Sequence, residues 1–256
     1  MGPRFICQQC GECCAHIRGG IIKEDETFLR EHAYGKMPLI QLIPLEKMSF
    51  PLWDWEAKRF REWEQDINVD AKIQPSRAIL DLNENKAIII TYFMDYDSCP
   101  FLKNKKCLIY NKRRAYVCRL FPFQRTPFLN IGEMTKDFLG TCPAIEDLKI
   151  PDGIKEQVKL FNKYFQDGSF LNAVQNDIVT EWINKTIVGL VKNKIIRSAM
   201  NYPYGFLLKR IERAEKIDLT DYLISKRLYK KDEMTELISR FDGNIDAKER
   251  IKGFLE

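Results

Sequence analysis

Residues 7–14 read CQQCGECC, and this run of four cysteines dominates the sequence. It places Cys7, Cys10 and Cys13 three residues apart and adds Cys14 directly after them. Two-residue spacers let a loop direct successive thiolates at one centre, which is why C-x2-C recurs in zinc sites and in iron–sulfur sites. Adjacent side chains usually diverge, so Cys13 and Cys14 both reach a single ion only through a strained turn. We expect a metal site here and leave open which of the two ligates.

Four further cysteines lie downstream, and we predict that they complete one or two metal centres. They are Cys99, Cys107, Cys118 and Cys142, and the first and last of them precede a proline. A C-x2-C-x2-C run combined with a Cys-Pro ligand is the pattern of bacterial-type ferredoxins. The downstream cysteines also lack the paired C-x2-C spacing that zinc sites use. We therefore favour an iron–sulfur cluster of the 4Fe–4S type, with zinc as the alternative.

Two arginines beside Cys118 are candidate cofactor-binding residues. Arg114 and Arg119 could compensate the negative charge of a thiolate-ligated cluster, because guanidinium groups donate strong hydrogen bonds to anions. The alternative is ordinary surface ion pairing. His16, just after the cysteine run, is a weaker ligand candidate, since a lone histidine more often has a structural role.

Composition limits the kind of protein and its partners. The chain has 256 residues, 45% of them hydrophobic and 30% charged, which is typical of a folded globular protein. Its net charge of +5 is too small to argue for nucleic acid. No apolar run is long enough to span a bilayer, and residues 1–7 lack the pattern of a signal peptide. We expect a cytoplasmic protein with a redox or other protein partner and no membrane or nucleic-acid partner.

Apolar periodicity predicts an α+β fold that is mainly helical and contains one small β-hairpin. We expect helices over 22–33 and 53–67, and hairpin strands over 77–82 and 86–94. Beyond Pro151 the pattern predicts only helices, over 154–165, 170–194, 203–215, 219–228 and 231–241. We therefore predict a cysteine-cluster domain over 1–150 and a helical region over 151–256 that packs on it.

The cysteine motifs together resemble the YkgJ family, whose members carry a CxxCxxCC domain described as zinc- or iron-chelating. The resemblance covers residues 5–145 and rests on CQQCGECC, CPFL at 99–102, CLIY at 107–110, the Arg114 to Pro122 segment and Cys142-Pro143. It implies metal or iron–sulfur chelation through these cysteines. Ala115 stands where the family usually has proline.

A protein-modifying enzyme is a further alternative, because flagellin lysine-N-methylases have a similar cysteine cluster. The sequence shows no glycine-rich strand–helix loop of the nucleotide-binding kind, so no S-adenosylmethionine site can be identified. Whether the chain is an enzyme stays open at this point.

Overall fold

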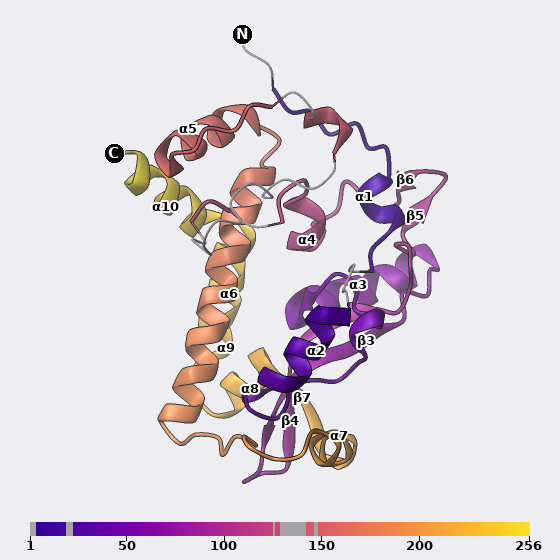
Figure 1. Cartoon of the computed structure of the whole chain (residues 1–256), viewed down its shortest axis with the longest axis vertical. Coiled ribbons are helices and arrows are strands. Elements are labelled where there is room, and N and C mark those ends of the chain that lie inside the picture. Colours follow the sequence, from indigo (N-terminus) through magenta and orange to yellow (C-terminus); the bar gives the residue numbers. More distant parts are fainter. Residues whose placement is uncertain (1–3, 19–22, 125, 129–141, 146–147) are drawn as a thin grey trace. The chain divides into compact units, whose positions relative to one another are not determined.

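The computed structural model describes residues 4–18, 23–124, 126–128, 142–145 and 148–256 (Figure 1). It is α+β and mainly helical, with a small sheet and a helical C-terminal region, as the sequence predicts. Two compact units interleave along the chain. We call residues 1–13, 104–185 and 235–256 the helical unit, and residues 14–103 and 186–234 the sheet unit. This division differs from the predicted boundary at residue 150, which stays a prediction.

The sheet unit is built around a long antiparallel hairpin of β3 and β4. Turn residues 82–85 join the two strands, and Asn85 takes a positive φ of 54°. Three-residue β1 pairs with β3, whereas β2 and β7 both pair with β4. β7 runs parallel to β4 and pairs with its first residues, while β2 pairs near its other end. The strands are β1 (Leu39–Gln41), β2 (Leu52–Trp53), β3 (Ile73–Asp81), β4 (Lys86–Met94) and β7 (Glu215–Asp218).

Burial on both faces explains why the hairpin is so apolar. Ile79, Leu80 and Ile88 have no exposed surface, and Ile89 is also buried. A strand covered on both sides shows a continuous apolar run in place of alternation. The run is long and rich in β-branched residues, so the hairpin could be predicted from sequence.

Helix α3 covers the sheet with an aromatic face. It spans Asp54–Ile67 and buries Ala57, Phe60 and Trp63, which follow one another at helical spacing, together with Trp55. These aromatics form core. The other helices of the sheet unit are α2 (Lys23–His32), the 3-10 turn η1 (Leu45–Lys47), α7 (Tyr204–Arg213) and α8 (Leu219–Ser225). Short strand β5 (Leu102–Lys103) ends the first segment of this unit.

The helical unit packs α5 against α10 (Figure 1). Phe123, Phe161 and Phe170 are buried beside one another, with ring centroids 5.3–5.6 Å apart. This aromatic cluster is the core of the unit. The unit also holds β6 (Lys106–Cys107), α4 (Tyr116–Arg119), the 3-10 turn η3 (Pro143–Ile145), α5 (Ile154–Tyr164) and α10 (Ile245–Leu255). Three helices include residues of both units, namely α1 (Glu12–Ala15), α6 (Ser169–Lys192) and α9 (Lys231–Asp242).

Several predicted bounds need correction. Glu215 is the first residue of β7 and not the end of a helix, because its backbone N–H donates to Asn85 in the adjoining turn. Helix α8 ends at Ser225, three residues before its predicted end. Helix α10 was not predicted, because its buried face contains only Ala247 and Ile251. Ile22, the predicted first residue of the helix over 22–33, lies outside the described residues.

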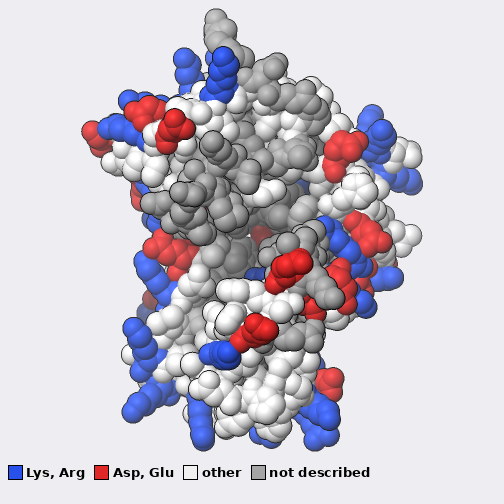
Figure 2. Space-filling view, viewed as in Figure 1, with Lys and Arg blue, Asp and Glu red and all other residues white. Residues whose placement is uncertain are grey.

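Charged side chains of both signs are interspersed on the face drawn in Figure 2. Across the described residues, no helix has both the length and the apolar character needed to cross a membrane.

Candidate metal centre

Six of the eight predicted cysteine ligands belong to the helical unit, and two belong to the sheet unit. None of the eight is in a disulfide. The helical unit contains Cys7, Cys10, Cys13, Cys107, Cys118 and Cys142, and the sheet unit contains Cys14 and Cys99. The boundary between the units therefore falls between the adjacent cysteines of the CxxCxxCC run.

An aromatic anchor fixes the loop that carries the N-terminal triplet, which we define as Cys7, Cys10 and Cys13. Phe5 is buried, its ring packs 5.1 Å from that of Phe165, and its N–H donates to Tyr164 over 2.9 Å. Directly after this anchor, the Cys7 and Cys10 thiols are exposed. Gly11 has a φ of 82°, a left-handed conformation that glycine tolerates best. The loop is thus held at its base while its thiols are accessible.

The pKa of the Cys142 thiol responds to the charges of all three thiols of the N-terminal triplet. Burial raises the pKa of the Cys142 thiol, and the charges of Cys10, Cys7 and Cys13 raise it further. In the opposite direction, the N–H of Ala144 donates a hydrogen bond to the Cys142 sulfur. This N–H is available because η3 begins directly after Cys142. A backbone N–H aimed at a thiol stabilises its thiolate form, which is the form that binds metal.

Cys107 repeats the same local arrangement. Burial raises the pKa of the Cys107 thiol, and the charge of Cys13 raises it further. In the opposite direction, the N–H of Ile109 donates to the Cys107 sulfur and lowers the pKa, as does the charge of Arg114. Two thiols in this unit therefore accept a hydrogen bond from the backbone two residues later.

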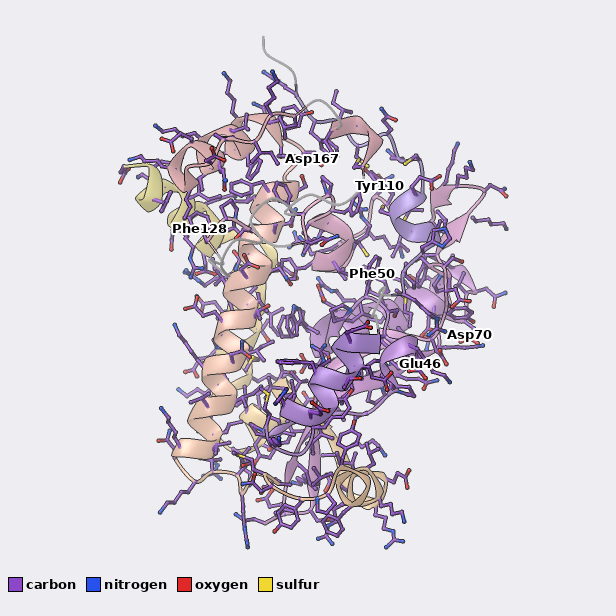
Figure 3. The ribbon with its side chains drawn as sticks, viewed as in Figure 1. Glu46, Phe50, Asp70, Tyr110, Phe128 and Asp167 are labelled. Carbon is purple, nitrogen blue, oxygen red and sulfur yellow. The ribbon has the colours of Figure 1, made fainter. Side chains whose placement is uncertain are left out.

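Tyr110, which is labelled in Figure 3, connects the segment that carries Cys107 to the N-terminal triplet. Its hydroxyl is hydrogen-bonded to the Cys7 thiol, and the Arg114 guanidinium lies 4.2 Å from the centre of its ring. Burial raises the pKa of Tyr110, and the bond to Cys7 raises it further. The neutral phenol is therefore held as a donor to sulfur.

Arg114 is the better placed of the two predicted cofactor-binding arginines. It lies near Cys107 and Tyr110, and its Nη1 donates to the Cys118 carbonyl over 3.5 Å. Its Nε is buried and makes no hydrogen bond in the described structure. A buried donor without an acceptor, close to thiols, suits a negatively charged thiolate centre. Cys118 itself is partly buried near the end of α4.

The described contacts of the Arg119 side chain are with residues other than the cysteines. Its guanidinium donates to Asn172 over 2.8 Å, lies 3.8 Å from the Asp242 carboxylate and stacks 4.4 Å from the Tyr116 ring centre. Its side chain is only 12% exposed, so this is a mostly buried ion pair between α4 and α9. These contacts fit the ion-pairing alternative, and a role for Arg119 toward a cofactor stays a prediction.

In the sheet unit, Cys14 and Cys99 are joined through their backbones. The Cys99 N–H donates to the Cys14 carbonyl, and the Ile17 N–H donates to Asp97, each over 2.8 Å. Arg18 reinforces this pairing with an ion pair 3.0 Å from Asp95. The structure thus brings these two predicted ligands together, and their role stays a prediction.

The donor set fits a thiolate-bound metal, although the side chains are not assembled around an ion. Within the residues that the structure describes, no three His, Cys, Asp or Glu side chains converge closely enough to coordinate one. The fit rests on the chemistry: soft thiols, two N–H···S hydrogen bonds and the orphaned Arg114 Nε. Zinc and iron–sulfur clusters both accept such donors.

Sequence reasoning missed the contacts that support the thiols. Tyr110 belongs to the CLIY motif beside Cys107, yet its hydroxyl contacts Cys7. The CLIY motif contained a signal, because a buried tyrosine hydroxyl needs a hydrogen-bond partner. The partner itself could not be read from sequence, because Cys7 is distant along the chain.

These features define a cysteine-rich metal-binding protein. The chain belongs to the CxxCxxCC family, described as "Putative zinc- or iron-chelating domain", whose model matches residues 6–143. The match confirms the family predicted from the cysteine motifs. No curated protein and no solved structure matches the chain significantly. The likeness to lysine-N-methylases stays a prediction.

Proposed function

We propose that the chain is an iron–sulfur protein whose 4Fe–4S-type cluster serves electron transfer or supports a redox reaction. The observation that carries this proposal is the C-x2-C-x2-C triplet together with Cys142-Pro143, and it is supported by the charges of the three triplet thiols, which all raise the pKa of Cys142. A C-x2-C-x2-C triplet with a Cys-Pro thiol is the ligand pattern of bacterial-type ferredoxins. We assign Cys7, Cys10, Cys13 and Cys142 as the ligands of this cluster. When bound, the cluster would supply one-electron redox chemistry.

The chain's own groups have defined tasks in this proposal. The Ala144 N–H and the Tyr110 hydroxyl donate to ligand sulfurs, which stabilises added negative charge and raises the reduction potential. The Arg114 guanidinium does the same through its positive charge. Cys107 and Cys118 lie in the same unit and would supply two of the four ligands of a second centre.

A substitution in the triplet loop tests this proposal. Anaerobically purified protein should be brown, with broad absorbance near ~400 nm, as thiolate-bound iron–sulfur clusters are. Cys7→Ala should abolish most of that absorbance because it removes a ligand. Gln8→Ala is the matched control, since Gln8 is an exposed neighbour in the same loop. Equal absorbance in both variants, or a colourless wild-type protein after reconstitution with iron and sulfide, would remove the proposal.

Structural zinc is the second candidate, because the matched family is described as chelating zinc or iron. Four thiolates suit a closed tetrahedral zinc site. In that case the protein would be colourless, contain zinc without labile sulfide, and unfold when a strong chelator removes the metal. The helical region would then act as an interaction module.

A further inference from the structure

A second feature of the sheet unit suggests a ligand other than metal. Gln41, the last residue of edge strand β1, is paired in register with Arg77 of β3. Directly opposed residues on neighbouring strands place their side chains on the same face. Accordingly, the Arg77 Nε donates to the Gln41 Oε1 over 3.1 Å.

The Gln41–Arg77 pair has N–H donors that bind no acceptor in the described structure. The Gln41 side chain is only 7% exposed, yet its Nε2 donates to nothing in the described structure. Arg77 forms no ion pair with a described carboxylate, and burial lowers the pKa of its guanidinium. A buried amide nitrogen without an acceptor destabilises a fold, and a half-buried guanidinium without a counter-charge adds to this cost. The Gln41 amide nitrogen and the Arg77 guanidinium lie side by side, and an anion bound between them would accept hydrogen bonds from both.

Two further observations concern the surroundings of the Gln41–Arg77 pair. The pairing of β3 with β4 shifts register on both sides of Arg77, and such irregularities redirect side chains and are frequent at binding sites. Tyr34 and Tyr204 stack 4.5 Å apart at nearly parallel ring planes beside the pair. The Tyr204 hydroxyl donates to the Gln41 carbonyl, which fixes the aromatic wall to β1.

We propose that Arg77 and Gln41 bind an oxyanion, the carboxylate or phosphate group of a small molecule, beside the Tyr34–Tyr204 stack. The guanidinium supplies charge and paired donors, and the Gln41 amide supplies one more donor. The stacked rings offer a flat apolar surface to the remainder of the ligand. This site uses no cysteine, so it stands independently of the proposed cluster.

Thermal unfolding of the metal-loaded full chain tests the proposal. Sodium phosphate and sodium acetate are titrated separately against sodium chloride at equal ionic strength. We expect one of the two oxyanions to raise the unfolding midpoint above the chloride value, and the effective salt identifies the source as phosphate or carboxylate. Arg77→Met should weaken the apparent affinity ~10-fold or more, as expected for losing a charged hydrogen bond. The exposed Arg210→Gln on α7 is the matched control and should behave as wild type.

The stability of the anion-free variant gives a second readout. Arg77→Met should leave the midpoint unchanged or raise it, because it replaces an uncompensated charge by an apolar chain of similar length. If neither oxyanion exceeds chloride, or if Arg77→Met retains wild-type affinity, the proposal is overturned. Should Arg77→Met fail to fold, Gln41→Leu decides: weakened binding supports the site, and unchanged binding contradicts it.

Discussion

Tyr110 is the residue through which the protein most directly tunes a bound cluster. Tyr110→Phe removes the hydroxyl that bonds to the Cys7 sulfur and leaves the ring beside Arg114. A lost hydrogen bond of ~1 kcal/mol lowers a one-electron potential by about 40 mV. Protein-film voltammetry should therefore give a more negative potential for this variant. Tyr164→Phe is the control, because the Tyr164 hydroxyl donates to the Ala144 carbonyl over 3.4 Å and to no cysteine sulfur among the described residues. A shift of the same size in both variants contradicts the assignment.

Asp54 makes folding stability depend on pH. Burial raises the pKa of Asp54 to about 6 from its usual value of 3.8, even though Thr220 donates two hydrogen bonds to its carboxylate. Between these two values the folded chain holds more protons at this site than the unfolded chain, so stability falls as pH rises.

Asp54→Asn removes this dependence. The free energy of unfolding of wild type minus that of the variant should decrease by about 2 kcal/mol between pH 4 and pH 7 and stay constant above. Denaturant titrations of both proteins at each pH provide the measurement. A difference that is flat across this range, or that increases with pH, is incompatible with a raised pKa.

At the scale of elements, the aromatic core of the helical unit holds the segments that carry the ligands. Phe161 on α5 has no exposed surface and packs against Phe123, which follows α4, and Phe170 on α6. Phe161→Ala should lower the free energy of unfolding by about 3–5 kcal/mol, because it leaves a cavity. Denaturant unfolding followed by circular dichroism measures this loss. Phe254→Ala on α10, where the ring is 37% exposed, should cost under ~1 kcal/mol. Similar losses in the two variants would place the core elsewhere.

Elements with strong local patterns were predictable from sequence, and those made by distant pairing were not. The hairpin of β3 and β4 and the aromatic helix α3 have long, regular apolar patterns. Strand β7 has four residues, none of them fully buried, and forms only because it meets β4. The site follows the same rule. The local Cys142-Pro143 motif could be read from sequence and predicts a ligand, whereas the contact of Tyr110 with Cys7 joins residues that are distant along the chain.

For the whole molecule, metal would act as a cross-link within the helical unit. Joining Cys13 to Cys142 closes a loop of about 130 residues, which the chain-entropy model values at about 5 kcal/mol. Metal removal should therefore raise hydrogen exchange at amides near Cys7–Cys13 and Cys142 and leave β3 and β4 protected. Exchange followed by mass spectrometry distinguishes this from a uniform change over both units, which would contradict a local cross-link.

The iron and acid-labile sulfide content of the full chain purified without oxygen decides whether it holds an iron–sulfur cluster. We expect about four iron and four sulfide for each filled 4Fe–4S site, and one such site less in Cys142→Ala. Zinc without iron or sulfide, in protein that also fails to take up a cluster on reconstitution, would contradict it.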